Sequence, residues 1–275
     1  MFLVFDIGGT NMRIAISSDG RTIKSSKIVP TPKEFENGIE ALKQVVVELS
    51  SGEKITAVAG SVAGPLDKTK SMLVASPHIP GWIQKPFKTQ LESVFECRVL
   101  LENDTALGGL GEAVFGAGAG NKIVAFINIG TGVNGAKIED GKIDENALGF
   151  ETGHQIIVPS GKPCNCGGKG HLESYIGGEN IERIYGQKAE DLKDPAAWDE
   201  IAKYAAIGIN NTIVHWSPDI LVLGGSVSQS LPLDRVKAHL TEELKIFPQI
   251  PEVVLGTLGH DAGFCGALKL LSLVD

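Results

Sequence analysis

The sequence predicts an α/β protein made of two related domains. Short apolar segments typical of buried strands alternate with segments whose apolar residues recur at helical spacing. A hairpin that turns at Gly8-Gly9-Thr10 recurs later in the chain, where it turns at Gly130-Thr131-Gly132. Because a repeated supersecondary unit indicates a duplicated fold, we expect two domains of similar construction that face each other. The alternative is a coincidence between two glycine hairpins, which are common.

Composition narrows the class of protein. The chain has 275 residues, of which 43% are hydrophobic, which suffices for the core of one large domain or two smaller ones. The net charge of −8 argues against a nucleic-acid partner, which needs a basic face, but backbone amides can still hold an anionic nucleotide. We expect no secretion signal, because Asp6 interrupts the apolar start, and no membrane span, because long apolar runs are absent. Two of the four cysteines are one residue apart, a spacing that suits metal better than a disulfide, so we expect a cytoplasmic protein.

The elements of the first half follow from alternation and from turn residues. Strands are expected at Phe2–Ile7 and Met12–Ser17, and the turn at Asp19-Gly20 leads to a third strand at Thr22–Val29. The remaining elements are a helix over 36–49, a strand at Ile55–Ala59, a proline- and glycine-rich loop over 64–86 that covers a site, and a strand at Val99–Leu101. That last strand ends at Glu102-Asn103-Asp104, where a helix begins.

The second half repeats this opening. Strands at Val124–Ile129 and Asn134–Ile138 flank the second glycine turn, and Asp140-Gly141 closes the hairpin as Asp19-Gly20 does in the first half. Residues 142–172 are rich in loops. The later elements are a helix whose apolar face runs from Trp198 to Ile213, a strand at Ile220–Leu223 that ends in Gly224-Gly225, and helices at Leu233–Leu244 and Gly263–Leu271 on either side of a strand at Val253–Leu255.

Both glycine turns suit phosphate binding. Glycines let backbone N–H groups converge on an anion, and Thr10 and Thr131 would add hydroxyl donors. Two such turns facing each other would hold the phosphates of one nucleotide, and Gly224-Gly225 would lie at the edge of that nucleotide. The alternative is that both turns are plain tight hairpins. Asp6, beside the first turn, suits Mg²⁺ bound through water, although a turn-capping Asp is the other interpretation.

Asp104 stands where α/β proteins place their ligands, at the end of a buried strand. A carboxylate there can accept the proton of an attacking hydroxyl in phosphoryl transfer. The alternative is an ordinary helix N-cap, which these residues alone favour.

A cluster of soft and borderline ligands predicts a metal site. His154, Cys164, Cys166 and His171 offer two imidazoles and two sulfurs among glycines that permit tight loops. Four protein ligands close the coordination sphere, so the expected ion is a structural Zn²⁺. The alternative is a surface loop with incidental cysteines.

Taken together, these motifs resemble the ROK family, named for repressors, open reading frames and kinases. The resemblance runs from Phe5 to about Leu270 and rests on four segments. They are Asp6-Ile7-Gly8-Gly9-Thr10 with Arg13, Leu101-Glu102-Asn103-Asp104, Gly130-Thr131-Gly132-Val133, and Glu151-x-Gly153-His154 followed by Cys164-x-Cys166-Gly167 and Gly170-His171-Leu172-Glu173.

The resemblance implies a fold and a set of roles. The fold is the two-domain actin-like ATPase (ribonuclease H-like) fold with a cleft between an N-terminal α/β domain, residues 1–105 joined by a helix at 262–275, and a C-terminal α/β domain, residues 106–261. Asp104 would be the general base, and His154 would bind zinc with one ring nitrogen and a sugar hydroxyl with the other. The sugar ligands would be Asn103, Glu151, His154, Glu173 and Gly64, and the ligands of MgATP would be Asp6, Gly8, Gly9, Thr10, Asn11, Thr131, Gly132, Gly224 and Gly225.

The expected function is ATP-dependent phosphorylation of a hexose hydroxyl, at C6 of glucose or a related sugar, by a homodimer. The sequence departs from the family pattern where His171 replaces a cysteine and where His78 replaces the Asn of the sugar loop, which leaves the sugar open. A sugar-responsive repressor would carry a DNA-binding segment ahead of Asp6, where we expect none; an inactive sugar sensor is the other alternative. The expected effect of the metal is on the sugar site, with nucleotide binding nearly intact.

Overall fold

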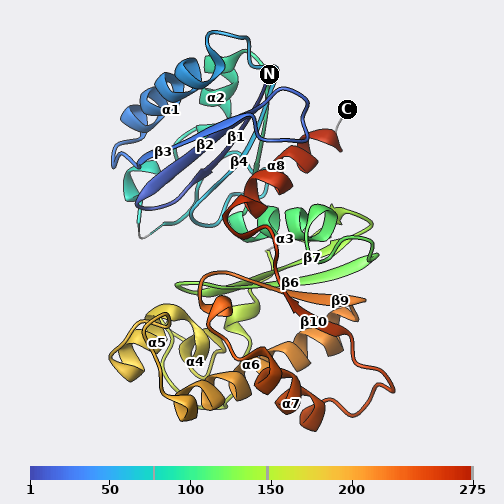
Figure 1. The fold of residues 1–275 in the computed structure, drawn as a ribbon. Helices are drawn as coiled ribbons and strands as arrows, with labels where there is room; N and C mark the ends of the chain where they lie inside the picture. Colours follow the sequence, from blue (N-terminus) through green and yellow to red (C-terminus); the bar gives the residue numbers. More distant parts are fainter. Residues whose placement is uncertain (77, 147–148, 274–275) are drawn as a thin grey trace. The chain divides into compact units, whose positions relative to one another are not determined.

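The computed structural model describes residues 1–76, 78–146 and 149–273. The chain divides into two compact units (Figure 1). Unit 1 comprises Met1–Val114 and His260–Asp275, and unit 2 comprises Phe115–Gly259. The boundary expected after residue 105 falls inside a helix, Asp104–Phe115, nearly all of which belongs to unit 1.

Unit 1 contains a five-stranded sheet in the order β3-β2-β1-β4-β5. β2 runs antiparallel to both β1 and β3, whereas β4 is parallel to β1 and β5 is parallel to β4. The strands are β1 Phe2–Ile7, β2 Asn11–Ser17, β3 Ser25–Pro30, β4 Ala57–Val62 and β5 Arg98–Glu102, and the helices are α1 Phe35–Ser50, α2 Phe87–Phe95, α3 Asp104–Phe115 and α8 Ala262–Ser272, with 3₁₀ turns at Pro80–Trp82 and Gly259–Asp261.

The alternation of β1 sends its side chains into two separate cores. Leu3, Phe5 and Ile7 pack with α1, α2 and the buried Trp82 on one face of the sheet. Val4, from the other face, packs with α3 and with Phe264 of α8. Helices therefore cover both faces of the unit 1 sheet, and one of these helices, α8, comes from a distant part of the chain (Figure 1).

Unit 2 has the same strand topology. Its sheet order, β8-β7-β6-β9-β10, corresponds strand for strand to β3-β2-β1-β4-β5, and the antiparallel and parallel pairings match. The strands are β6 Ile123–Ile129, β7 Val133–Glu139, β8 Lys142–Ile143, β9 Ile220–Gly224 and β10 Glu252–Leu255. The two related α/β units expected from the repeated hairpin are thus confirmed, and the repeat extends to the whole sheet.

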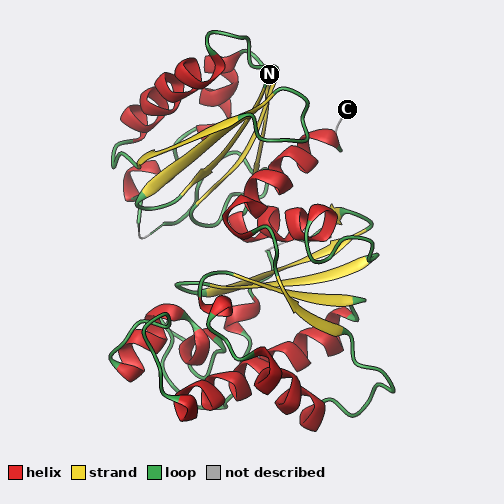
Figure 2. Cartoon of the chain, viewed as in Figure 1, coloured by secondary structure: helices red, strands yellow, loops and turns green. Residues whose placement is uncertain are grey.

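Helices cover one face of this second sheet (Figure 2). They are α4 Glu173–Ile176, α5 Gly178–Tyr185, α6 Pro195–Trp216 and α7 Leu233–Glu243, with 3₁₀ turns at Thr152–His154 and Val227–Gln229. Ile127 of β6 and Leu223 of β9 lie in one core with Ile201 of α6 and Val236 of α7. No helix within the described residues is both long and apolar enough to cross a membrane.

Two expected strands are displaced. The third strand begins at Ser25 rather than Thr22, because the Asp19 carboxylate accepts hydrogen bonds from the N–H groups of Arg21 and Thr22 and keeps that stretch in a turn. The fourth spans Ala57–Val62 instead of Ile55–Ala59. The strand can continue through residue 60 because glycine has no Cβ. A Cβ there would lie 2.4 Å from the ring of Phe5 on β1, so only glycine fits the ladder at that point.

Candidate functional site

The first glycine turn leaves two backbone amides free. Gly8 N–H donates to the carbonyl of Asn11 at 2.9 Å. Thr31, the residue after β3, anchors the turn through its N–H to Thr10 O at 2.9 Å and its hydroxyl to Gly8 O at 2.7 Å. No described residue accepts a hydrogen bond from the N–H of Gly9 or Thr10. Adjacent free amides of this kind form an anion-binding concavity.

The loop over 64–86 packs directly against this turn. A Cβ added to Gly9 would lie 2.3 Å from Cβ of His78, so only glycine fits there. Gly64, where the loop begins, has φ +133, and a Cβ would lie 2.2 Å from Ala75 O. The loop is thus held close to the turn at one end and folded sharply at the other.

Asp6 faces the strand next to it rather than the turn. Its Oδ1 accepts a hydrogen bond from Ser61 Oγ at 2.7 Å, and the two residues are partners in the β1–β4 ladder. Within the described residues, no N–H group of the first turn donates to this carboxylate. The turn-capping interpretation therefore has no support, and Oδ2 is left for a ligand.

Asn103, not Asp104, caps α3. Asn103 Oδ1 accepts from the N–H groups of Thr105 at 3.0 Å and Ala106 at 3.2 Å, as an N-cap side chain does. The cap expected from the residues alone at Asp104 is therefore wrong: Asp104 is the first residue of the helix, with Oδ1 on Thr105 N–H at 2.7 Å. The Nδ2 of Asn103 donates to no described residue and is available to a ligand.

The environment of Asp104 makes it more basic. Its side chain is accessible to solvent, yet the protein atoms around it weaken its hydration, which raises the pKa of the carboxyl. The negative charge of Asp6 raises this pKa further. A carboxylate with a raised pKa beside an anion-binding turn is suited to accept a proton.

The buried Glu102 forms an ion pair with the half-exposed Lys70, which sequence reasoning missed. The Glu102 side chain is 9% exposed and that of Lys70 is 50% exposed, and Lys70 Nζ contacts Glu102 Oε2. Glu102 Oε1 accepts from Asn103 N–H at 2.9 Å. The pair therefore joins the loop over 64–86 to the strand end that carries Asn103 and Asp104. The only feature of the sequence that indicated this pair was an acidic residue at the buried end of a strand, and that feature does not identify Lys70 as the partner.

The second glycine turn repeats the pattern of the first. Gly130 N–H donates to Gly132 O at 3.0 Å, and the N–H groups of Thr131 and Gly132 meet no acceptor among the described residues. Gly224 ends β9, which is paired with β6, and Gly225 follows it; a Cβ on Gly225 would lie 2.3 Å from Ile129 O just before the turn. The structure thus brings the expected residues Thr131, Gly132, Gly224 and Gly225 together in unit 2.

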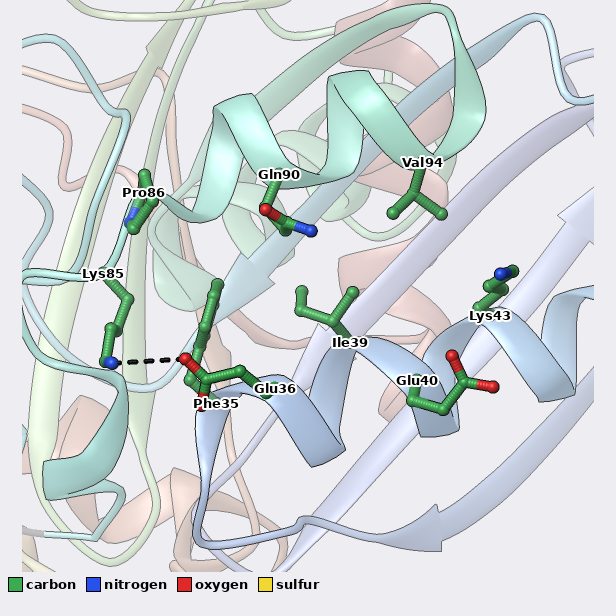
Figure 3. A pocket seen from close by; sticks show the side chains of 9 residues that line it. All are labelled: Phe35, Glu36, Ile39, Glu40, Lys43, Lys85, Pro86, Gln90 and Val94. Atoms are coloured by element: carbon green, nitrogen blue, oxygen red, sulfur yellow. Dashed lines mark hydrogen bonds and ion pairs between the residues drawn. The ribbon is translucent and has the colours of Figure 1, made fainter.

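A pocket of about 370 Å³ opens beside the second turn, within the usual size of ligand sites. Its lining consists of Gly130, Thr131, Gly178, Glu179, Glu182, Lys188, Ala189, Glu190, Ser226 and Val227. Sequence reasoning missed the residues from 178 to 190, because no motif in that segment ties it to the turn. Another pocket, of about 400 Å³, lies between α1 and α2 of unit 1 and includes none of the expected site residues (Figure 3).

The four expected metal ligands converge. One ligand atom from each of His154, Cys164, Cys166 and His171 lies within 4.8 Å of the others. Cys164 Sγ is 3.7 Å from His154 Nδ1, and Cys166 Sγ is 3.3 Å from His171 Nδ1. The edges of a tetrahedral zinc site with these donors measure about 3.3–3.8 Å, so the donor set fits zinc with small inward movements of the side chains.

Two of the expected sugar ligands lie beside this metal cluster, defined here as His154, Cys164, Cys166 and His171. Nδ1 of His154 points to Cys164, while its Nε2 is 3.9 Å from Oε2 of the exposed Glu151. Glu173 Oε1 is 3.9 Å from Cys164 Sγ, and its Oε2 accepts from Val133 N–H at 2.9 Å. The ring of His154 therefore presents one nitrogen to the cluster and the other to a carboxylate.

Comparison with known proteins gives one consistent result. The chain is 28% identical to a glucokinase of Streptomyces coelicolor, over 96% of this chain and 95% of that one. Its fold superposes on a ROK hexokinase from Thermus thermophilus with a TM-score of 0.89, at 29% identity over 99% and 98% of the two chains. A ROK family glucokinase from Streptomyces griseus, solved with glucose and AMPPNP, gives a TM-score of 0.82 at 27% identity over 98% of each chain.

These relatives share the two-domain actin-like ATPase fold, which is therefore the fold of this chain. The model of the ROK family matches residues 3–273, which takes in both glycine turns, Asp104 and the metal cluster. The protein belongs to the ROK family.

Proposed function

We propose that this protein is an ATP-dependent sugar kinase that transfers the γ-phosphoryl group to a hexose hydroxyl, at C6 of glucose or a related hexose. The observation that carries the proposal is the state of Asp104, which is the first residue of α3 after the Asn103 cap, keeps Oδ2 free of hydrogen bonds to the described residues, and has a raised pKa beside Asp6. The glucokinase and hexokinase relatives support it, as does the complex of one of them with glucose and AMPPNP.

Asp104 acts as the general base. Its carboxylate takes the proton of the sugar hydroxyl as that oxygen attacks the γ-phosphorus, and the raised pKa strengthens the carboxylate as a base. The free amide of Asn103 donates to a sugar oxygen. The other groups proposed to bind sugar hydroxyls are the backbone at Gly64 and the side chains of Glu151, His154 and Glu173.

The free amides of the two turns bind the phosphates. Gly9 and Thr10 of unit 1 supply two, and Thr131 and Gly132 of unit 2 supply two more. Within each turn the backbone is held by its own hydrogen bonds, so each pair of amides can stabilise phosphate charge with little local reorganisation. The unit 2 pocket, with Gly224 and Gly225 nearby, takes the rest of the nucleotide; Gly8 and Asn11 hold the first turn in shape through their mutual hydrogen bond. Mg²⁺, bound through water at Asp6, would supply positive charge to the phosphates.

Zinc in the metal cluster would have a structural role, since four protein ligands leave no position for substrate. The chain's own residues would then bind the sugar: the ring of His154, held through Nδ1, presents Nε2 on the side of Glu151, and Glu173 lies at the start of α4. We propose further that the two units are the two domains and that the protein forms a homodimer.

A coupled assay of ADP release over a panel of hexoses and N-acetylhexosamines tests the function. We expect ADP formation that depends on one or a few sugars, with the product identified as a 6-phosphate by phosphorus NMR. Asp104→Asn should abolish most of it, while Asp140→Asn, on an exposed turn of unit 2, serves as the matched control. Binding of sugar and AMPPNP without sugar-dependent ADP release would identify a sensor and refute the proposal.

A further inference from the structure

Glu173, the first residue of α4, touches both the metal cluster and the second glycine turn. Its Oε2 accepts from Val133 N–H at 2.9 Å, and a Cβ added to Gly132 would lie 2.6 Å from the same oxygen. Its Oε1 lies 3.9 Å from Cys164 Sγ. A single carboxylate therefore links a metal ligand to the turn that carries the free amides.

The residues after Glu173 hold the same turn from behind. Gly178 N–H donates to Gly130 O at 2.8 Å, and Glu179 N–H donates to Thr131 O at 3.1 Å. Asn180 Nδ2 donates to the carbonyl of Glu173 at 3.0 Å, which ties α5 to the start of α4. The α4–α5 segment thus satisfies two carbonyls of the turn, and the orientation of the free amides depends on where that segment lies.

The metal ligands determine where that segment lies. His171 is two residues before Glu173, and the chain between them is fixed by Leu172 N–H on Gln155 O and Ser174 N–H on His171 O, both at 3.0 Å. The rest of the ligand loop is short turns with little regular structure. Coordination of four side chains by one ion removes the freedom of such a loop.

We propose that Glu173 is a positioning residue for the second glycine turn, and that metal in the cluster tightens nucleotide binding through it. The inference rests on the proposed function, because it takes this turn as the binder of nucleotide phosphates. The sequence led to the expectation that nucleotide binding is nearly independent of the metal, whereas the contacts of Glu173 lead to the opposite result.

The first test is titration of zinc-loaded protein with Mg²⁺–AMPPNP in sugar-free buffer, so that a role of Glu173 in sugar binding does not contribute. Glu173→Ala removes the acceptor of the buried Val133 N–H, and we expect the Kd to rise about 10–100-fold, as for loss of other groups that orient a metal site. Glu173→Gln keeps an oxygen at that place and should restore binding to within about threefold of wild type. Glu252→Ala, at an exposed position of β10, is the control.

The second test uses the wild-type chain, so it does not depend on the folding of a variant. Zinc is removed with a chelator, Mg²⁺ is restored, and AMPPNP is titrated before and after zinc is added back. We expect depletion to weaken binding about 10-fold or more and zinc to reverse the loss. In Glu173→Ala, depletion should cost less than it does in the wild type, since part of the effect of the metal reaches the turn through the Glu173 carboxylate.

The outcomes separate the inference from the proposed function. An AMPPNP Kd that is insensitive to Glu173→Ala and to zinc removal, in an enzyme that still phosphorylates sugar, overturns the inference alone. Full additivity of the two losses also overturns it, because independent sites add. Binding of AMPPNP that depends on Glu173 in a protein that transfers no phosphoryl group to any sugar refutes the proposed function and leaves the inference standing.

Discussion

Replacing Lys70 by Met should destabilise unit 1 through the carboxylate it leaves behind. Removal of one partner from a fully buried ion pair costs about 3–5 kcal/mol, whereas exposed pairs contribute about 0–1 kcal/mol. Glu102 is 9% exposed but Lys70 is 50% exposed, so water reaches one end of the pair. We therefore expect an intermediate loss of about 1–3 kcal/mol, which at about 4 °C for each kcal/mol lowers the melting temperature by about 4–12 °C.

Thermal melts followed by circular dichroism would measure this loss, with Lys68→Met, a change at an exposed lysine of the same loop, as the control. Glu102→Gln in the Lys70→Met background should recover part of the stability, because a buried amide costs less than a buried unpaired carboxylate. The KM for sugar should also rise in Lys70→Met, since Glu102 holds the N–H of Asn103. The reasoning would be refuted if Lys70→Met melted at the same temperature as the control Lys68→Met. It would also be refuted if the double variant Lys70→Met/Glu102→Gln were less stable than Lys70→Met alone.

Four further predictions concern the base, its pH dependence, the metal cluster and the oligomeric state. Asp104→Asn should lower kcat about 10²–10⁴-fold with AMPPNP affinity little changed, and sugar-dependent turnover within tenfold of wild type would contradict it. Because the pKa of Asp104 is raised and the base must be ionised, kcat/KM should fall as the pH drops through a value above the ordinary 3.8, and an acid limb at or below 3.8 would count against the assignment. Cys166→Ser should lose zinc by elemental analysis while His171→Cys keeps it, because thiolate serves equally well in a tetrahedral site; equal zinc in both variants would remove the basis for the cluster. Light scattering at micromolar concentration should give the mass of a dimer, and a monomer mass would refute the homodimer.

The features that the sequence predicts are local ones. The two hairpins were predicted because glycine turns interrupt alternating strands, and the metal cluster because its four ligands lie within one loop. Contacts between distant segments could not be predicted in this way. One such contact is the ion pair of Lys70 with Glu102, and another is the contact of the 178–190 segment with the second turn. The local sequence around these residues looks like that of any surface segment, so it gives no sign of the partner.

Asn103 and Asp104 show a second limit. Both side chains can cap a helix, and preference alone does not decide which of two neighbours does so. The choice depends on the direction in which β5 delivers the chain into α3, which places Oδ1 of Asn103 on two helical N–H groups. Only the three-dimensional path of the backbone assigns the cap to Asn103 and makes Asp104 the first residue of the helix.

The position of α8 has a consequence for the order of synthesis. Phe264, Leu268 and Leu271 of this helix cover one face of the unit 1 sheet, yet they are translated after all of unit 2. Unit 2 is continuous in the chain, so it can complete its core while α8 is still in the ribosome, and domains generally fold as units as they emerge. Until α8 emerges, Val4, Ala15 and Ala59 of the amino-terminal sheet are covered only in part, by Leu107 of α3. During translation the half of the protein that is made first is therefore the half that is finished last.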